Sequence, residues 1–469
     1  MTQLQALADA FGARNVLHDP PDVAPYAVDW RGAYRGMPLA VLRPGTVEEV
    51  AAAVRACAAA GVPVVPAGGR TGLCGGAVVA ENGPPAAVLS LERLNRVRAI
   101  DARDFSIVAE AGCVVQQVQE AAAAVDRLFP LSWGAQGSAQ IGGALSTNAG
   151  GIRTLRWGNA RDLVLGLEVV LPDGRVLNDL RRVRKDNSGY ALRHLFLGGE
   201  GTLGVITAAA LRLVPALRRV ETAFAAVPSP DAALSLLSRV LGSGAEVIAF
   251  ELVLRRCMEI VDRYGQRTRM PMALESPWYV MVEIAAAHPA VPLREMLEDT
   301  LDAAMEAGEC TDAVLAENEE HRAAFWRIRE DYPDCVRRAG PAISTDTAVP
   351  VSAVPAFLQR AEQELAARWP EGRMVAVGHA GDGNMHPTVI FPPGDPAAER
   401  RAVAAFGAIM ELGLALGGTI TGEHGVGMLK RDWLTRELGE VSVHLHRQLK
   451  SVFDPQGLLN PTKMLPAGQ

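Results

Sequence analysis

The order of apolar and polar positions predicts a chain that mixes helices and strands. Residues 47–60 form a helical pattern, with Thr46 as its N-cap and Glu49 three residues later. Short apolar runs flank this helix at 38–43 and 63–66 and predict strands. Further short β-rich runs lie at 87–91, 106–110, 165–171 and 204–214. The first part of the chain is therefore predicted to be α+β and rich in strands.

A second domain is predicted to begin at residue 216, where the pattern becomes rich in Ala and Leu after Pro215. Strands are expected at 247–254, 278–284, 374–379 and 385–391, and long helices at 320–332, 354–369 and 398–416. We therefore divide the chain into an N-terminal helical segment, a first domain, a second domain and a C-terminal segment, at 1–36, 37–215, 216–430 and 431–469.

Composition and charge narrow the class of protein. Hydrophobic residues make up 49% and charged residues 21%, which is typical of a folded globular chain. The net charge is −7 with no large basic cluster, so nucleic acid is not an expected partner. No uncharged stretch reaches the ~20 residues of a membrane helix, and the start has no secretory leader pattern. The six cysteines form no CxxC pair. We expect a cytoplasmic protein with reduced thiols and no transmembrane segment.

Two glycine-dense loops in the first domain are candidate binding features. Residues 66–76 read PAGGRTGLCGG after a strand, and residues 137–143 read GSAQIGG, followed by TNAGG at 147–151. Glycine lets consecutive N–H groups turn inward, and it lacks the Cβ that would keep a diphosphate at a distance. Flexible turns without a ligand are the alternative for either loop alone. The GxGxxG at 199–204 precedes a strand rather than a helix, so a nicotinamide-binding Rossmann site is rejected.

A second set of candidate residues lies near the end of the chain. His379 and His386 bracket the turn AGDGN, and strand-like runs on both sides predict that they face each other across a hairpin. Opposed residues have Cβ atoms roughly 5 Å apart, so both imidazoles would reach one divalent ion. Glu423 and His424 place an acid and a base in the glycine-rich stretch 417–427. Two histidines and a carboxylate form a common catalytic metal set, whereas turn histidines with a purely structural role are the alternative.

Taken together, these segments resemble a known family. With PGTVEEV at 44–50, KDNSGY at 185–190 and GEGTLGVIT at 199–207, they resemble the vanillyl-alcohol-oxidase, or PCMH-type, FAD-binding fold. From about Tyr26 to Pro466 the chain is similar to the D-2-hydroxy-acid dehydrogenases: D-lactate and D-2-hydroxyglutarate dehydrogenases and the flavin subunit of glycolate oxidase. The resemblance implies a two-subdomain FAD-binding domain, an α+β substrate domain with an antiparallel sheet, and a C-terminal segment that returns to the FAD domain.

The resemblance also implies cofactors and roles for single residues. It assigns metal ligation to His379, His386 and Glu423, with zinc as the expected ion. His424 would bind the substrate and remove its hydroxyl proton, hydride would pass to the flavin, and Arg329 would bind the substrate carboxylate. FAD would be held without a covalent bond, its pyrophosphate on the first loop. The residues assigned to FAD are Pro66, Ala67, Gly68, Gly69, Arg70, Thr71, Gly72, Leu73, Pro130, Gly137, Ser138, Ile141, Gly142, Asn148, Gly151, Gly201, Gly204, Val205, Ile206 and Asn460.

Departures from the resemblance bear on the substrate. Pro333 and Ser344 stand where the 2-hydroxyglutarate enzymes have Thr and Lys, so a second substrate carboxylate would lack its cation unless Arg327, Arg337 or Arg338 replaced it. We therefore expect a D-2-hydroxy acid with a neutral side chain, lactate-like or larger. A dicarboxylate dehydrogenase, a glycolate-oxidase-type flavin subunit and a zinc hydrolase are the alternatives. A quinone, a cytochrome and an electron-transfer flavoprotein are open as electron acceptors, and a homodimer is compatible with the sequence.

Overall fold

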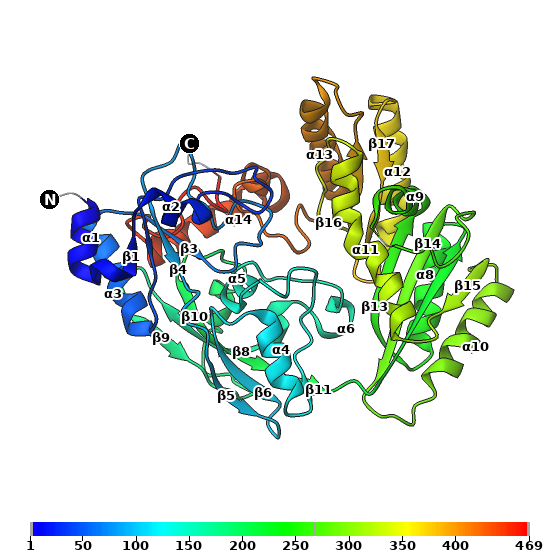
Figure 1. The fold of residues 1–469 in the computed structure, drawn as a ribbon, viewed down its shortest axis with the longest axis horizontal. Helices are drawn as coiled ribbons and strands as arrows, with labels where there is room; N and C mark the ends of the chain where they lie inside the picture. Colours follow the sequence, from blue (N-terminus) through cyan, green and yellow to red (C-terminus); the bar gives the residue numbers. More distant parts are fainter. Residues whose placement is uncertain (1–2, 267, 467–469) are drawn as a thin grey trace. The chain divides into compact units, whose positions relative to one another are not determined.

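The computed structural model describes residues 3–266 and 268–466, and its contacts divide the chain into two compact units (Figure 1). Unit 1 combines Met1–Gly151, Trp157–Ala216 and Glu423–Gln469, so the C-terminal segment returns to the unit that holds the glycine-dense loops. Unit 2 combines Ile152–Arg156 and Leu217–Gly422. The architecture is α+β, as expected.

Unit 1 begins with a small sheet in the order β1-β2-β4-β3, in which β2, β4 and β3 are parallel and β1 is antiparallel. Helix α3 (Val47–Ala60) connects β2 to β3 and has the ends that the sequence predicts. The Thr46 hydroxyl accepts a hydrogen bond from the Glu49 amide at 3.2 Å, and Gly61 is left-handed with φ 62°. The strands are β1 (Val16–Leu17), β2 (Ala40–Leu42), β3 (Val64–Ala67) and β4 (Ala87–Ser90).

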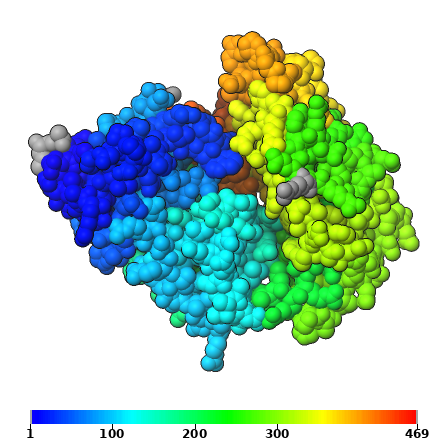
Figure 2. Space-filling model, in the orientation of Figure 1, coloured from blue at the N-terminus to red at the C-terminus, as the bar shows by residue number. Residues whose placement is uncertain are grey.

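The other large sheet of unit 1 is antiparallel, in the order β5-β6-β10-β8-β9. Its strand β10 begins directly after Gly204, which confirms that the GxGxxG precedes a strand. The turn of the β5–β6 hairpin projects from the surface of this unit (Figure 2). The strands are β5 (Val97–Asp101), β6 (Ser106–Glu110), β8 (Val164–Val170), β9 (Val176–Asp179) and β10 (Val205–Arg212). Other elements are α1 (Gln3–Phe11), α2 (Pro20–Val23), α4 (Val115–Ala123), β7 (Arg127–Leu128), α5 (Ile141–Ser146), α7 (Arg193–Phe196), β11 (Val214–Pro215) and α14 (Leu434–Phe453). Helix α6 (Thr154–Trp157) is divided, with its first three residues in unit 2 and Trp157 in unit 1.

Unit 2 is built on an antiparallel seven-stranded sheet in the order β15-β12-β14-β13-β18-β19-β16. Its strands are β12 (Arg219–Val227), β13 (Glu246–Leu254), β14 (Trp278–Ala286), β15 (Asp312–Leu315), β16 (Thr347–Ala348), β18 (Val377–His379) and β19 (Asn384–Met385). Helices pack against this sheet in one apolar core. They are α8 (Pro230–Gly242), α9 (Arg255–Tyr264), α10 (Leu293–Glu306), α11 (Glu319–Ala339), α12 (Val354–Arg368) and α13 (Ala398–Ala415).

Three details of unit 2 differ from the sequence prediction. The strands expected at 374–379 and 385–391 are each divided, because β17 (Arg373–Val375) and β20 (Thr388–Ile390) pair in a separate sheet. Helix α11 continues past Pro333 to Ala339. The expected pairing of His379 with His386 is wrong. The register of the hairpin places Asn384, and not His386, opposite His379. The His386 amide donates a hydrogen bond to the Val377 carbonyl at 2.8 Å.

The cysteines agree with the expectation of reduced thiols. All six are buried, and none of them forms a disulfide. Burial raises the pKa of the Cys57 thiol to about 12, so this group is unreactive at neutral pH. Within the described part of the chain, no helix is both long enough and apolar enough to cross a membrane.

Candidate functional site

The two glycine-dense loops of unit 1 are held together by close contact of their backbones. A Cβ on Gly69 would overlap the carbonyl oxygen of Ser138, and a Cβ on Gly142 would overlap the side chain of Ala111. A Cβ on Gly68 would lie 3.4 Å from the amide nitrogen of Gly143 in α5. At Gly69 the missing side chain thus serves the packing of one loop on the other, and at Gly142 it serves the packing of the second loop on Ala111. The sequence had suggested ligand space at such positions.

Ligand space is present at other glycines of the same loops. A Cβ on Gly72 or Gly143 would meet no described atom within 4 Å. The side-chain oxygens of Gln140 and Asn460 are buried and have no hydrogen-bond partner among the described residues. Gln140 lies beside the first loop, since its Oε1 is 3.5 Å from the Cβ position of Gly68. Open space lined by glycine, beside orphaned polar atoms, fits a polar ligand such as FAD.

Left-handed residues other than glycine occur in both loops and at other positions of unit 1. Arg70, Asn148, Glu200 and Asn460 have positive φ angles of 57°, 51°, 49° and 45°. A left-handed conformation costs a residue other than glycine about 1–2 kcal/mol, and such strain gathers at binding sites.

The remaining residues assigned to FAD differ in their exposure to solvent. The buried ones are Ala67, Pro130, Ile141, Gly142, Gly151, Gly201, Gly204, Val205 and Ile206. The half-buried ones are Pro66, Gly68, Gly69, Thr71 and Leu73, and the exposed ones are Gly72, Gly137 and Ser138.

The second candidate site is built on one face of the unit 2 sheet. Glu251 of β13 lies directly opposite His379 of β18. Its Oε1 is 2.5 Å from Nδ1 of His379, and its Oε2 accepts a hydrogen bond from Nε of Arg329 on α11 at 3.1 Å. Glu251 is 0% exposed. One buried carboxylate therefore contacts both a candidate metal ligand and the candidate substrate arginine.

His386 is held in a similar way by backbone. Its Nδ1 is 2.9 Å from the carbonyl oxygen of Thr345, which accepts hydrogen bonds only. Nδ1 of His386 therefore carries the proton, and the acceptor Glu251 has the same effect on His379. Nε2 of both rings is left as the nitrogen that can bind a metal. The two rings lie edge to face with centroids 5.8 Å apart.

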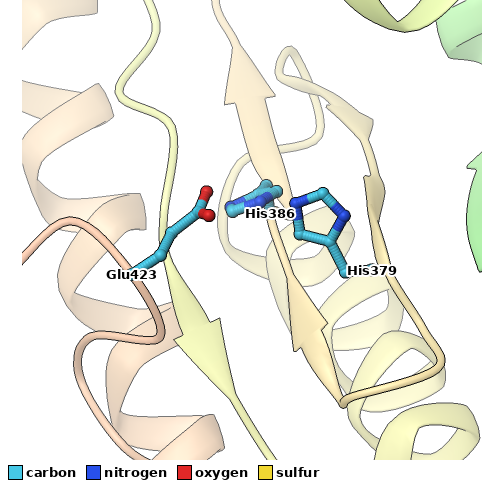
Figure 3. A group of neighbouring side chains, drawn as sticks. All are labelled: His379, His386 and Glu423. Carbon is cyan, nitrogen blue, oxygen red and sulfur yellow. The ribbon is translucent and has the colours of Figure 1, made fainter. Parts of the chain in front are cut away.

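Glu423 follows the last residue of unit 2. The preceding Gly422 donates its amide to the Asp346 carbonyl at 3.0 Å, and the Thr421 hydroxyl donates to the Asp346 carboxylate at 2.9 Å. One donor atom each of His379, His386 and Glu423 lies within 4.8 Å of the others. Figure 3 shows the Glu423 carboxylate pointing toward the ring of His386, which lies beside His379.

The donor set fits a divalent ion. Two imidazole nitrogens and a carboxylate oxygen are the ligands of many catalytic zinc sites, which keep further positions open. His424 comes next in the chain, and its Nε2 is 3.4 Å from Oε1 of Glu423. Asp346, Glu423 and His424 form a second group of donors with the same close spacing. His424 thus lies beside the ligand set, where a general base is expected.

The carboxyl of Glu251 has a lowered pKa. Burial alone would raise the pKa of this carboxyl, but its contacts with His379 and Arg329 lower it to about 2. Among the described residues, no hydrogen bond or ion pair uses the two terminal nitrogens of Arg329, and its side chain is 17% exposed. A guanidinium with terminal N–H groups left over suits a carboxylate ligand.

The three arginines considered as replacements for the missing lysine do not supply an inward cation. Arg327 is exposed on α11, and Arg337 is exposed and pairs with Asp334 at 2.5 Å. Arg338 is exposed and donates to the Tyr264 carbonyl at 3.0 Å. All three therefore lie on the solvent side of their helix.

Sequence reasoning missed Glu251 and Glu200. The signal for Glu251 in the sequence is a single acid inside the apolar run VIAFELVL. This signal is ambiguous, because an acid in a strand can also lie on a face that is exposed to solvent. Glu200 belongs to the glycine-rich stretch 199–204, and its buried carboxylate accepts hydrogen bonds from the amides of Val426 and Gly427 at 2.6 and 2.8 Å. It anchors the backbone that follows His424.

Comparisons with known proteins match the chain to two family models. Residues 216–464 match the family described as FAD linked oxidases, C-terminal domain, and residues 38–179 match the family described as FAD binding domain. The fold is similar to that of p-cresol methylhydroxylase, with a TM-score of 0.76 over 98% of this chain and 96% of that one, at 15% identity.

Two curated relatives extend over nearly the whole chain. A D-2-hydroxyglutarate dehydrogenase of Xanthomonas citri pv. viticola is 38% identical over 98% of this chain and 96% of its own length. A putative mitochondrial D-lactate dehydrogenase of Schizosaccharomyces pombe is 32% identical over 95% of this chain and 85% of its own.

Proposed function

Because the chain belongs to the FAD-linked oxidases, in the group that contains the D-2-hydroxy-acid dehydrogenases, we propose that it oxidises a D-2-hydroxy acid to the 2-oxo acid with the help of a divalent metal. The chain is an FAD-linked oxidoreductase. The hydrolase alternative has no use for the FAD-binding domain and is set aside. The metal, the roles of single residues and the substrate side chain belong to the proposal.

The observation that carries the metal is the geometry of His379, His386 and Glu423. Both imidazoles direct Nδ1 to an acceptor, so both keep Nε2 for an ion, and a carboxylate oxygen lies within 4.8 Å. Oxygen and nitrogen donors of this kind suit zinc, and positions left open would accept substrate oxygens.

The reaction removes two hydrogens from the substrate. A divalent ion held by His379, His386 and Glu423 would supply positive charge beside the hydroxyl, and FAD held in unit 1 would supply the hydride acceptor. The terminal N–H groups of Arg329 bind the substrate carboxylate and so fix the orientation of the α-carbon. The neutral imidazole of His424 accepts the hydroxyl proton as general base. Glu200 holds the backbone at 426–427 and thereby supports the position of His424.

We further propose a neutral substrate side chain. Pro333 and Ser344 offer no cation, and the arginines at 327, 337 and 338 are exposed. A second carboxylate left unpaired in a closed site would cost several kcal/mol. D-lactate or a larger apolar D-2-hydroxy acid is therefore expected to be preferred over D-2-hydroxyglutarate.

The test is a dye-reduction screen of D- and L-2-hydroxy acids on the purified full chain, with its visible spectrum and metal content recorded. We expect a yellow protein that releases FAD on denaturation and reduces the dye with D-acids only. A chelator should abolish turnover and leave FAD bound. Turnover that survives verified removal of metal would refute the metal-dependent mechanism.

A further inference from the structure

Two buried carboxylates lie on the same face of the unit 2 sheet, and they have different neighbours. Glu251 lies opposite Met281, so Glu283, two residues further along β14, is its diagonal neighbour. Glu283 is 2% exposed and binds Arg322, Trp326 and Thr222. Each acid thus pairs with an arginine from α11, but Glu251 also contacts a candidate metal ligand.

The contacts of Glu251 determine which nitrogen of His379 carries the proton. A carboxylate beside Nδ1 accepts a hydrogen bond, so the proton stays on Nδ1 and Nε2 keeps its lone pair for a metal. The other oxygen of the same carboxylate accepts a hydrogen bond from Nε of Arg329, and among the described residues no hydrogen bond uses the terminal N–H groups of that arginine. Both Nδ1 of His379 and Nε of Arg329 donate a hydrogen bond, so the side chain between them must offer an acceptor atom to each.

We propose that Glu251 is a positioning residue that sets the tautomer of His379 and the orientation of Arg329, and so couples metal binding to binding of the substrate carboxylate. This inference rests on the proposed function, in which His379 binds the metal. Glu251 itself touches neither metal nor substrate. Partners of this kind typically contribute 10–100-fold to metal affinity.

The substitution Glu251→Gln gives a specific expectation. Arg329 is always a donor, so the amide oxygen must face Arg329 and the amide NH₂ must face Nδ1 of His379. His379 would then carry its proton on Nε2 and lose the lone pair for the metal. Removal of the guanidinium by Arg329→Met frees the amide to turn round, so that its oxygen accepts from Nδ1 again.

The experiment measures zinc affinity by chelator competition on the full-length FAD-bound protein, for wild type, E251Q, R329M, the double variant E251Q/R329M and E283Q. We expect E251Q to bind zinc about 10–100-fold more weakly, R329M and E283Q to bind it as wild type does, and the double variant to recover most of the loss. E283Q is the matched control, since it weakens an equally buried acid–arginine pair.

Equal zinc affinity of wild type and E251Q would overturn the proposal, as would an equal loss in E283Q or no recovery in the double variant. Imidazole ¹⁵N chemical shifts of the metal-free protein give a second readout, with the His379 proton expected on Nδ1 in wild type and on Nε2 in E251Q. If wild type binds no zinc, the proposed function fails. The shifts then still decide the role of Glu251, and an unchanged tautomer in E251Q overturns it.

Discussion

The two candidate sites of this protein place their residues by different means. In unit 1 the two glycine-dense loops proposed to bind FAD are shaped by backbone, with Gly69 against Ser138 and with Arg70 and Asn148 in the left-handed conformation. In unit 2 the candidate metal ligand His379 and the candidate substrate residue Arg329 are held by a side chain, the carboxylate of Glu251. The shape of a loop that is determined by its backbone depends on the positions of its glycines, and these positions can be read directly from the sequence. A side-chain network depends on strand register and burial, which the sequence does not show directly.

The largest expected effect tests the backbone half of this comparison. Gly69→Val should abolish FAD retention, because a Cβ there overlaps the Ser138 carbonyl and forces the loops apart. FAD content per chain and thermal unfolding of the purified protein measure this. Full flavin content in Gly69→Val would contradict the packing of the two loops.

Gly143→Ala is the matched variant, because its Cβ meets no described protein atom. Alanine is favoured over glycine inside a helix by roughly 1 kcal/mol, so the FAD-free protein should be no less stable. FAD affinity should nevertheless fall, since the new methyl group enters ligand space. If FAD affinity is unchanged, the space beside Gly143 is not part of the FAD site.

A second pair of variants distinguishes the proposed general base, His424, from a proposed metal ligand, His379. His424→Ala should lower kcat by roughly 10²–10⁴-fold, as expected for a missing general base, and retain the metal. His379→Ala should lose the metal as well. Steady-state kinetics and metal analysis on the FAD-bound protein distinguish the two. Loss of metal in His424→Ala would mean that the roles of Glu423 and His424 are exchanged.

The preference for one substrate over another is expected to be a smaller effect than the loss of the base or of the metal. Values of kcat/KM for D-lactate, D-2-hydroxybutyrate, D-mandelate, D-malate and D-2-hydroxyglutarate should favour the neutral side chains, because the described residues at 327, 333, 337, 338 and 344 offer no inward cation. A dicarboxylate preferred by about tenfold, or about 1.4 kcal/mol, would show that another cation binds the distal carboxylate.

The smallest expected effect concerns backbone strain in the C-terminal segment. Thr462 has φ 68°, which is unusual for a β-branched residue. Thr462→Gly should raise the free energy of unfolding by about 0.5–1 kcal/mol, because about 1–2 kcal/mol of strain is relieved and backbone entropy offsets part of it. Thr462→Ala keeps the Cβ and should give no gain. Equal stabilities of all three proteins in denaturant titrations would exclude stored strain.

Local signals in the sequence predicted those parts of the fold that local chemistry determines. The cap at Thr46 and the strand after Gly204 are examples. The register of the His379 hairpin was wrong, since turn length and the division of the strands depend on neighbouring strands. Glu251 was missed because its importance comes from partners 128 and 78 residues away in the chain. The purpose of Gly69 was misread because its close neighbour belongs to a second loop.

The central claim is that oxidation of a D-2-hydroxy acid by the bound flavin requires a metal held by His379, His386 and Glu423. Anaerobic rapid mixing of the FAD-bound protein with the best D-acid of the screen, before and after metal removal, measures this step directly as bleaching of the visible flavin band. We predict bleaching in the zinc-reconstituted wild type, and none in the metal-free protein or in His386→Ala. Bleaching at the same rate in metal-free wild type would contradict the account.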